Sequence, residues 1–455
     1  MNYLKHFSTK SLALALLVIL FTSCKDYTDL DPQTVDTGNA DFSSYVAVGN
    51  SLTAGFQNDA LYQSAQQFSY PLLIAHQVNK SQNFEQPLVS DPGISGDGRI
   101  ELKSLKPLVT QRNPDQGQPV NGELSQPYNN LGIPGIILAD FLGQDLPNAP
   151  YAARKEANPF FKVVLRDMGD TQVEQMAAQN PTFITFWAGN NDVLGFVTSG
   201  GTGQSITPVD AFNDLYQASA QQLAATGADV VVYNIPNVTN IPFVFYLRTQ
   251  LEQQGAIVFN DETQSYQLAT PEGSFDIYIE TQNGPRVMRQ SDFPLLSAQK
   301  YFGKIQAGEV SPPIMPQDAI PDELVLDGPA GEPEGSSELE QAIIAIKSYN
   351  QIIDQVASAS GFALVDINSI FGETFETFQA SGGEKGYQTD GVNLRPVPSE
   401  LFSFDGVHPT NRGSAVLANE TIKTINHHFG ANIPPINVSK IPEGLPVISE
   451  PAAAE

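Results

Sequence analysis

The chain has 455 residues, of which 41% are hydrophobic and 26 are phenylalanine, so it can bury a large core and is not disordered as a whole. Its 23 Lys and Arg stand against 50 Asp and Glu, a formal net charge of −27 at pH 7, and so acidic a surface repels phosphate backbones and argues against nucleic acid as a partner. The five histidines and the single cysteine form no cluster with zinc-ligand spacing, so no metal and no cofactor is expected.

The first segment of the chain has the pattern of a secretory signal. Lys5 and Lys10 give a basic start, and the apolar run Leu12 to Phe21 follows. This run is too short for a bilayer-spanning helix, which takes about 20 apolar residues. The segment ends at Cys24 as Phe-Thr-Ser-Cys, which resembles a bacterial lipoprotein signal in which the cysteine becomes the acylated first residue. The alternative is ordinary signal cleavage that leaves an unpaired thiol.

Residues 1–23 are therefore expected to be a lipoprotein signal peptide, and residues 24–41 an acidic tether. Such an opening resembles those of surface lipoproteins of Bacteroidetes-like bacteria. The resemblance implies a protein of the cell envelope, held in the outer membrane by a lipid on Cys24, on the periplasmic face or the cell surface. Through this anchor the membrane is one expected partner.

One domain is expected from residue 42 to residue 429, followed by a Pro-rich tail at 430–455. Within the domain, short β-rich runs alternate with helical periods in the order βαβαβαβα, which predicts a parallel sheet covered by helices with right-handed crossovers. The expected strands are 45–48, 182–187, 229–233 and 362–367, and the expected closing helix is 411–428.

Two helices of this pattern have start signals. Thr207 is expected to be the N-cap of the helix after the second strand, with Pro208 at its first position. Ser337 and Glu340 have the spacing of a capping box, and Gly361 is expected to end the helix that they begin.

Two segments, residues 85–128 and 241–335, interrupt the alternation. The first is rich in Gly, Pro, Asp and Gln and contains a hairpin-like run, and the second mixes short strand-like pieces with a Pro-rich stretch. In an open α/β sheet the ligand site lies beyond the carboxyl ends of the strands, where such loops gather. Both segments are expected to be insertions at the rim of the core, forming a lid or a substrate-selecting wall.

Ser51 lies in the run Gly49 to Gly55, between the first expected strand and a helical stretch. A serine in this place has its backbone N–H at a helix N-terminus, where the dipole and the free amides favour a developing oxyanion. Serine is also a common helix cap, so Ser51 taken alone is explained as readily by capping.

Asp405 and His408 lie on a turn just before the closing helix. An Asp three residues before a His can place both groups on one side, hydrogen-bond the imidazole and fix its tautomer. A serine nucleophile needs such a base with an orienting carboxylate. Taken alone, a His-Pro turn also occurs in ordinary loops.

Between these two motifs lie two others, Asn-Leu-Gly-Ile-Pro-Gly at 130–135 and Gly-Asn-Asn-Asp at 189–192, each expected to follow a strand. With all four motifs in order, the chain resembles the SGNH/GDSL hydrolase family from residue 45 to about residue 429. The resemblance implies a three-layer α/β/α sandwich with a mainly parallel sheet in flavodoxin-like strand order, to which the two interrupting segments are added at the rim.

The resemblance also implies a serine ester hydrolase that works through an acyl-enzyme. Ser51 matches the nucleophile, His408 the general base and Asp405 the orienting carboxylate. The oxyanion hole would consist of the N–H of Ser51, the N–H of Gly135 and the side-chain amide of Asn191. Neither a metal nor a cofactor takes part.

Asn50 departs from the family pattern, which usually has Asp before the serine. That Asp is not the triad carboxylate, so catalysis is still expected, but Asn50 favours the alternative of a non-catalytic surface binding lipoprotein with the same fold.

For an enzyme, the substrate alternatives are lipid acyl esters and acylated glycans, and the apolar runs 243–247 and 371–378 slightly favour lipidic or aryl esters. Trp187 is expected in the core, and Asp192 is expected to hold the loop that presents Asn191. The sequence indicates no oligomeric state.

Overall fold

The computed structural model describes residues 35–447, apart from 106–107, 311–312, 314 and 332. Two units are distinguished by their internal contacts, Met1–Asp36 and Thr37–Glu455, and the described residues belong almost wholly to the second. Cys24, the expected signal peptide and most of the expected tether lie outside the described residues. Over the described part of the chain, no helix combines the length and apolar character needed to cross a membrane.

A five-stranded parallel sheet forms the centre of the second unit. Its spatial order is β14-β6-β5-β1-β4, so that, counted along the chain, the second strand lies outside the first and the others follow in sequence. This is the flavodoxin-like order, and the expected fold class is confirmed. The strands are β1 (Tyr45–Gly49), β4 (Asn130–Gly132), β5 (Phe183–Trp187), β6 (Asp229–Tyr233) and β14 (Ala363–Val365).

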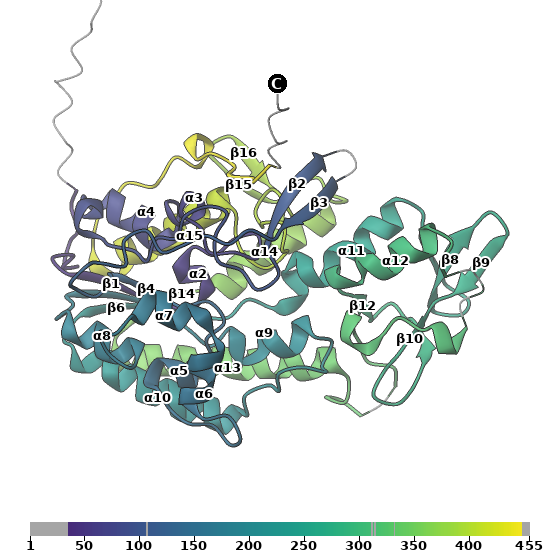
Figure 1. Ribbon diagram of the computed structural model, residues 1–455, viewed down its shortest axis with the longest axis horizontal. Helices are drawn as coiled ribbons and strands as arrows, with labels where there is room; N and C mark the ends of the chain where they lie inside the picture. Colours follow the sequence, from purple (N-terminus) through teal and green to yellow (C-terminus); the bar gives the residue numbers. More distant parts are fainter. Residues whose placement is uncertain (1–34, 106–107, 311–312, 314, 332, 448–455) are drawn as a thin grey trace, which may run out of the picture. The chain divides into compact units, whose positions relative to one another are not determined.

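Helices cover both faces of the sheet, as Figure 1 shows. The strands β1 and β5 are buried along their whole length, which explains why their sequences read as continuous apolar runs without alternation. One face carries α4 (Tyr70–Gln77) and α15 (Asn411–Phe429), and the other carries α5 (Leu138–Leu142), α8 (Gln172–Ala178), α10 (Val209–Ala225) and α13 (Glu338–Ser360).

The register of the sheet brings three of the sequence motifs to one edge. Gly49 at the end of β1 pairs with Gly132 of β4 on one side and with Trp187 of β5 on the other. The strands are parallel, so their carboxyl ends meet at the same edge. The segments that follow them, which contain Ser51, Gly135 and Asn191, therefore start from neighbouring points.

The expectation of four strands is wrong, because Asn130–Gly132 is itself a strand and not the loop after one. Its register with β1 runs from Ala47↔Asn130 to Gly49↔Gly132. A strand of three residues is too short to show an apolar run, so the pattern that revealed the other strands could not reveal β4.

The fourth expected strand, 362–367, is shorter than predicted. It ends at Val365, because the Asp366 carboxylate accepts a hydrogen bond from the backbone N–H of Ser369 at 3.0 Å and so caps the next helix. The Phe-rich run that follows is this helix, α14 (Ile367–Ala380).

The predicted start of α10 is also wrong by one residue. Pro208 occupies the N-cap position without a side-chain hydrogen bond, and the hydroxyl of Thr207 instead donates to the carboxylate of Asp192 at 2.8 Å. In contrast, Ser337 caps α13 by accepting a first-turn backbone N–H at 3.3 Å, and Gly361 ends that helix with φ 71°.

The two rim segments form distinct structures. Residues 85–128 contain an antiparallel hairpin of β2 (Arg99–Leu105) and β3 (Leu108–Asn113). Residues 241–335 contain a three-stranded antiparallel sheet and have a hydrophobic cluster of their own, which includes Leu251, Ile279 and Phe302. The elements of this second segment are α11 (Pro242–Gln253), β7 (Ile257–Asn260), β8 (Ser265–Thr270), β9 (Gly273–Asp276), β10 (Tyr278–Ile279), β11 (Arg286–Val287), β12 (Phe293–Pro294), α12 (Gln299–Gln306) and β13 (Val325–Leu326).

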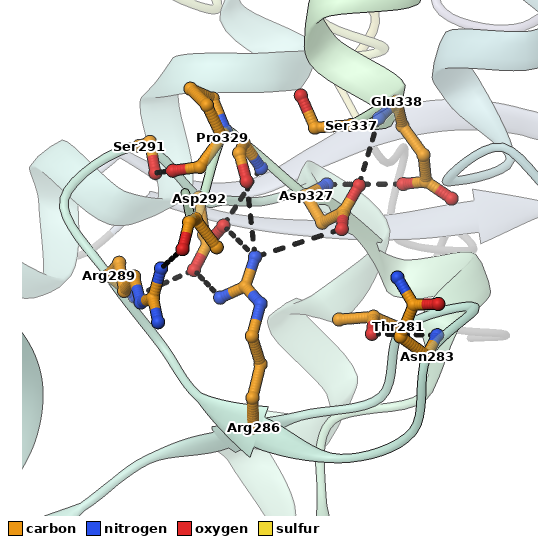
Figure 2. Close-up of polar contacts among 12 residues, drawn as sticks. Thr281, Asn283, Arg286, Arg289, Ser291, Asp292, Asp327, Pro329, Ser337 and Glu338 are labelled. Carbon is orange, nitrogen blue, oxygen red and sulfur yellow. Dashed lines mark hydrogen bonds and ion pairs between the residues drawn. The ribbon is translucent and has the colours of Figure 1, made fainter. Parts of the chain in front are cut away.

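A polar network fixes the end of the second rim segment to α13, as Figure 2 shows. The fully buried Asp292 accepts hydrogen bonds from both terminal nitrogens of Arg286, at 2.6 and 2.8 Å. Asp327 accepts the backbone N–H of Glu338 at 2.9 Å, at the first residue of α13. The bidentate pair of Arg286 and Asp292 is strong and directional and orders this part of the segment, and the Asp327 bond joins the segment to the start of α13.

The described part of the Pro-rich tail runs along α15. The side-chain amide of Asn419 exchanges two hydrogen bonds with the backbone of Ile436, at 2.7 and 2.9 Å, and Asn426 does the same with Ile433 at 2.9 Å. The remaining elements are α2 (Ser51–Ala54), α3 (Gln63–Gln66), α6 (Tyr151–Ala157), α7 (Pro159–Leu165), α9 (Asn191–Thr198), β15 (Tyr387–Thr389) and β16 (Val392–Leu394).

Candidate active site

The turn from β1 into α2 presents Ser51 as the first residue of a short helix. Gly49 permits this turn, because a Cβ there would lie 2.5 Å from the carbonyl oxygen of Trp187. Asn50 is the N-cap, and its side-chain oxygen accepts the backbone N–H of Leu52 at 3.0 Å. The backbone N–H of Ser51 therefore lies at a helix N-terminus, where anionic oxygens are favoured.

Asn50 also joins this turn to the Gly-Asn-Asn-Asp loop. Its side-chain amide donates to the side-chain oxygen of Asn190 at 3.1 Å, and both residues are buried. An ionised Asp at this position would keep the cap but, since it only accepts hydrogen bonds, would require Asn190 to present its amide instead. Asn50 thus has a structural role that is compatible with a working site.

The structure brings the three expected triad side chains together, although Ser51 and His408 lie 357 residues apart in the chain. The Oγ of Ser51 lies 2.8 Å from Nε2 of His408. The Nδ1 of His408 lies 3.1 Å from Oδ2 of Asp405. This chain of contacts has the order required for a serine nucleophile, a general base and an orienting carboxylate.

Asp405 is held ionised by its surroundings. Burial acts to raise its pKa, but the charge of His408 and hydrogen bonds from the His408 side chain and from the backbone N–H groups of His408 and Val407 outweigh it and lower the pKa to about 2. The two backbone bonds are 2.8 and 2.9 Å long. The carboxylate is therefore a fixed negative charge beside the imidazole at neutral and moderately acidic pH.

The turn between Asp405 and His408 also contacts the second rim segment. The backbone N–H of Phe243, in the first turn of α11, donates to the carbonyl oxygen of Gly406 at 2.9 Å. Gly406 has φ 72°, and a Cβ there would lie 2.8 Å from the nitrogen of Phe243. Glycine is therefore required for both the backbone conformation and the close approach of α11.

The expected oxyanion donors lie on two further loops. Asn191 is the first residue of α9, and its side-chain amide donates one hydrogen bond to the carbonyl oxygen of Ile136 at 2.7 Å, which leaves its second N–H available. Asn191 lines the same pocket as Ser51 and His408, whereas Gly135 is not among the residues that line it. Gly135 lies in the loop after β4 with φ 80°.

Asp192 holds the loop that carries Asn191. It is buried, and its carboxylate accepts the backbone N–H of Leu138 and the hydroxyl of Thr207, each at 2.8 Å. Burial outweighs these hydrogen bonds and raises the pKa of Asp192 to about 7. Through its two hydrogen bonds to Leu138 and Thr207, Asp192 fixes the start of α9 to α5 and to the segment before α10.

A narrow apolar pocket of about 60 Å³ opens beside Ser51 and His408. Trp187 lines it and is itself buried, stacked on Tyr233 with 4.6 Å between the ring centroids and 14° between the planes. The sequence motifs did not indicate the apolar wall of this pocket, most of which comes from α9, from the segment after β6, from α14 and from the turn around His408, with single residues from α2 and α15. Its members are Leu52, Val193, Leu194, Ile235, Pro236, Val238, Ile241, Phe371, Leu401, Phe402, Val407, Pro409 and Leu417.

The described residues contain no group of three or more His, Cys, Asp or Glu side chains that could hold a metal ion. The site contains the hydroxyl of Ser51, the imidazole of His408 and the carboxylate of Asp405. It also contains hydrogen-bond donors, which are backbone N–H groups and the side-chain amide of Asn191. These groups suit acyl transfer, in which a nucleophile attacks a carbonyl and the resulting oxyanion is stabilised by hydrogen bonds.

Comparison with protein families identifies the chain. The model of GDSL-like lipases and acylhydrolases matches residues 45–278, a little more than half of the 455 residues. The chain belongs to this family. It is therefore a carboxylic ester hydrolase of the GDSL type. The match begins at β1 and ends at β10, so Asp405 and His408 lie beyond it, and their assignment rests on the geometry above.

Solved structures of GDSL esterases are among those similar to this chain. The acetyl xylan esterase AlAXEase is 13% identical, covering 83% of this chain and 98% of its own, with a TM-score of 0.33. Axe2, an acetylxylan esterase from Geobacillus stearothermophilus, is 12% identical, with 85% and 96% covered and a TM-score of 0.35. A GDSL-like lipase from Parabacteroides merdae is 12% identical, with 84% and 96% covered and a TM-score of 0.32. Similarity at this level carries no argument about substrate. Comparison with curated proteins finds no match.

Proposed function

We propose that this GDSL hydrolase cleaves carboxylic esters of short acyl chains through an acyl-enzyme on Ser51. The observation that carries the proposal is the 2.8 Å contact between Ser51 Oγ and His408 Nε2, with Asp405 at the other imidazole nitrogen. His408 takes the hydroxyl proton as Ser51 Oγ attacks the ester carbonyl. Asp405 stabilises the imidazolium that forms and keeps the ring in the required tautomer.

The tetrahedral intermediate carries a negatively charged oxygen, which must be stabilised by hydrogen-bond donors. In this proposal they are the N–H of Ser51 at the start of α2, the N–H of Gly135 and the second side-chain N–H of Asn191. The imidazolium then gives its proton to the leaving alcohol. A water molecule, activated by His408, releases the acyl group from Ser51 by the reverse proton path.

The pocket supports a short acyl chain. Its walls are apolar and its volume is about 60 Å³, so it has room for a few methylene groups only. In the sequence, the apolar runs 243–247 and 371–378 favour lipidic esters. In the structure, these runs serve mostly to pack α11 against α14. Phe245 contacts Phe375 and Phe378, with ring centroids 4.7 and 5.9 Å apart, and of this set only Phe371 lines the pocket.

A series of p-nitrophenyl esters from acetyl to palmitoyl tests the chain-length proposal. We expect kcat/KM to be highest for acyl chains of about two to six carbons and to fall at least about tenfold for chains of twelve carbons or more, since longer chains exceed the pocket. Acetylated xylan and lysophospholipid in the same series distinguish a glycan from a lipid alcohol. A maximum at palmitoyl would contradict the short-chain proposal.

A pair of matched variants ties this selectivity to the pocket. Phe371→Ala enlarges the pocket and is expected to shift the optimum to longer chains. Phe375→Ala, one turn further along α14 and outside the pocket, serves as the control and is expected to leave the optimum in place.

We also propose that Cys24 is lipidated and anchors the enzyme in the outer membrane. The basic start, the short apolar run and the lone cysteine support this. Cys24→Ser is expected to release the enzyme into the soluble fraction and to abolish labelling by radioactive palmitate. Retention of the variant in the membrane fraction would show that another segment holds the protein there.

A further inference from the structure

The turn Gln57–Ala60, which has no part in the family motifs, lies against the catalytic carboxylate. Gln57 and Ala60 exchange two backbone hydrogen bonds, at 3.1 and 3.0 Å, and the two residues between them, Asn58 and Asp59, have φ 53° and 62°. Positive φ at both central residues is the pattern of a type I′ turn. Among the described residues, no other pair of consecutive residues without a glycine has positive φ at both positions.

Such a conformation costs free energy for residues with a side chain, although Asn and Asp tolerate it better than most. Two adjacent residues in this state persist only where the surroundings hold them. The contacts of Asn58 and Asp59 show what holds this turn. They lead to the segment that contains Asp405 and His408, to Tyr62 and to the hairpin of the first rim segment.

Asn58 fixes the backbone just before Asp405. Its side-chain oxygen accepts the N–H of Phe404 at 2.9 Å, and its own N–H donates to the hydroxyl of Ser403 at 3.0 Å. Its side-chain amide donates to the hydroxyl of Tyr62 at 2.7 Å. Asn58 is almost completely buried, so every one of these bonds is made away from water, where losing a partner is costly.

Asp59 contacts the catalytic carboxylate itself. Its backbone N–H donates to Oδ2 of Asp405 at 3.0 Å, the same oxygen that faces Nδ1 of His408. Its carboxylate pairs with Arg112 of β3 at 2.6 Å, and the N–H of Ile100 of β2 donates to the carbonyl oxygen of Asn58 at 2.8 Å. The hairpin of the first rim segment therefore holds the turn against the triad.

We propose that Asn58 and Asp59 are positioning residues, which fix the Asp405 carboxylate so that one of its oxygens faces the imidazole of His408. The proposal rests on the triad function proposed above. It also gives the first rim segment a role, because the hairpin keeps the strained turn in place. Small displacements of catalytic groups reduce rates strongly, with about 1 Å of misplacement able to cost on the order of a hundredfold.

The decisive variant is Asn58→Gly. Glycine keeps the left-handed backbone without strain, so the substitution removes the side-chain bonds to Phe404 and Tyr62 while leaving the turn intact. We expect kcat for p-nitrophenyl acetate to fall by about tenfold to a hundredfold, with KM changed less than about twofold, because Asn58 is not among the residues that line the pocket beside Ser51. The acid limb of the pH–rate profile is expected to move to lower pH, because the imidazolium loses part of its stabilising carboxylate.

A matched control and a milder variant complete the test. Asn148 is another Asn with positive φ, 63°, in an exposed turn between α5 and α6, and Asn148→Gly is expected to leave kcat and the pH profile unchanged. If Asn58→Gly does not fold, Tyr62→Phe takes its place as the test variant, because it removes only the hydroxyl that accepts the hydrogen bond of the Asn58 side-chain amide. It is expected to lower kcat by about two- to fivefold without changing KM.

The outcomes separate this proposal from the one on which it rests. If Asn58→Gly, or Tyr62→Phe in its place, lowers the melting temperature but keeps the kcat and the pH profile of the wild type, the residues are merely structural and the positioning role is wrong. If the wild type hydrolyses esters no faster than Ser51→Ala, the triad function itself fails, whatever the Asn58 variant does.

Discussion

Ser51→Ala is expected to lower kcat for p-nitrophenyl acetate by about 10⁴- to 10⁶-fold, to the level left by binding and the oxyanion donors alone. The reason is that, among the residues that the structure describes, Ser51 supplies the hydroxyl at His408 Nε2, so the proposed acyl-enzyme is not expected to form without Ser51 Oγ. The measurement is initial-rate kinetics on the chain from Lys25 onward. Ser348→Ala, on the solvent-facing side of α13, is the matched control and is expected to retain the full rate.

Active-site labelling gives an independent reading of the same prediction. A fluorophosphonate probe is expected to attach to Ser51 in the wild type and not in Ser51→Ala, which mass spectrometry of the labelled peptide would show. Equal slow hydrolysis by both proteins, together with no labelling, would support the non-catalytic binding lipoprotein that Asn50 suggested from the sequence.

Asp405→Asn is expected to have the second largest effect, a fall in kcat of about 10⁴-fold with little change in KM. An amide can present its N–H to Nδ1, which favours the imidazole tautomer that cannot accept the proton of Ser51. Because the pKa of Asp405 is about 2, the carboxylate stays ionised at pH 4, and its own protonation does not contribute to the acid limb of the wild-type profile. A wild-type rate that is unchanged down to pH 4 would contradict the role of His408.

The same carboxylate links stability to pH. Its folded-state pKa of about 2 lies below the ordinary value of 3.8, so its contribution is fully present above pH 3.8 and is lost as the pH falls through 2. The shift corresponds to about 2 kcal/mol of unfolding free energy. Urea unfolding at pH 5 and at pH 2 should show this extra loss in the wild type and not in Asp405→Asn. Equal losses in the two proteins would mean that the carboxylate is not held ionised by its surroundings.

Four of the five strands and the four motifs could be predicted from sequence because each has a local signal. The central strands β1, β5 and β6 are continuous apolar runs, and in a parallel sheet this alone marks them as buried on both faces. The motifs that contain Ser51 and Asn191 follow β1 and β5, and parallel strands bring their carboxyl ends to one edge. The juxtaposition of Ser51 with His408 thus followed from the fold class and the resemblance together.

The features that sequence reasoning missed depend on contacts between distant residues. Asn58 and Ser403 lie 345 residues apart, and nothing in either segment indicates the other. The run Gln-Asn-Asp-Ala does favour a tight turn, but it does not indicate which residues the turn contacts. Thr207 was predicted as a cap from its neighbours alone, whereas the buried carboxylate of Asp192, which cannot be seen locally, takes its hydroxyl. The apolar pocket wall was missed for the same reason, since its residues come from segments that are far apart in the sequence.

The stack of Trp187 on Tyr233 has a practical consequence. Trp187 is the one tryptophan in the whole sequence, and it lines the pocket beside Ser51. The intrinsic fluorescence excited at long wavelength therefore originates within the active site and nowhere else. In the proposed mechanism an acyl group fills the pocket and so changes the surroundings of the indole ring. Formation and breakdown of the acyl-enzyme are then expected to be visible by stopped-flow emission, without a chromogenic leaving group and without any added label.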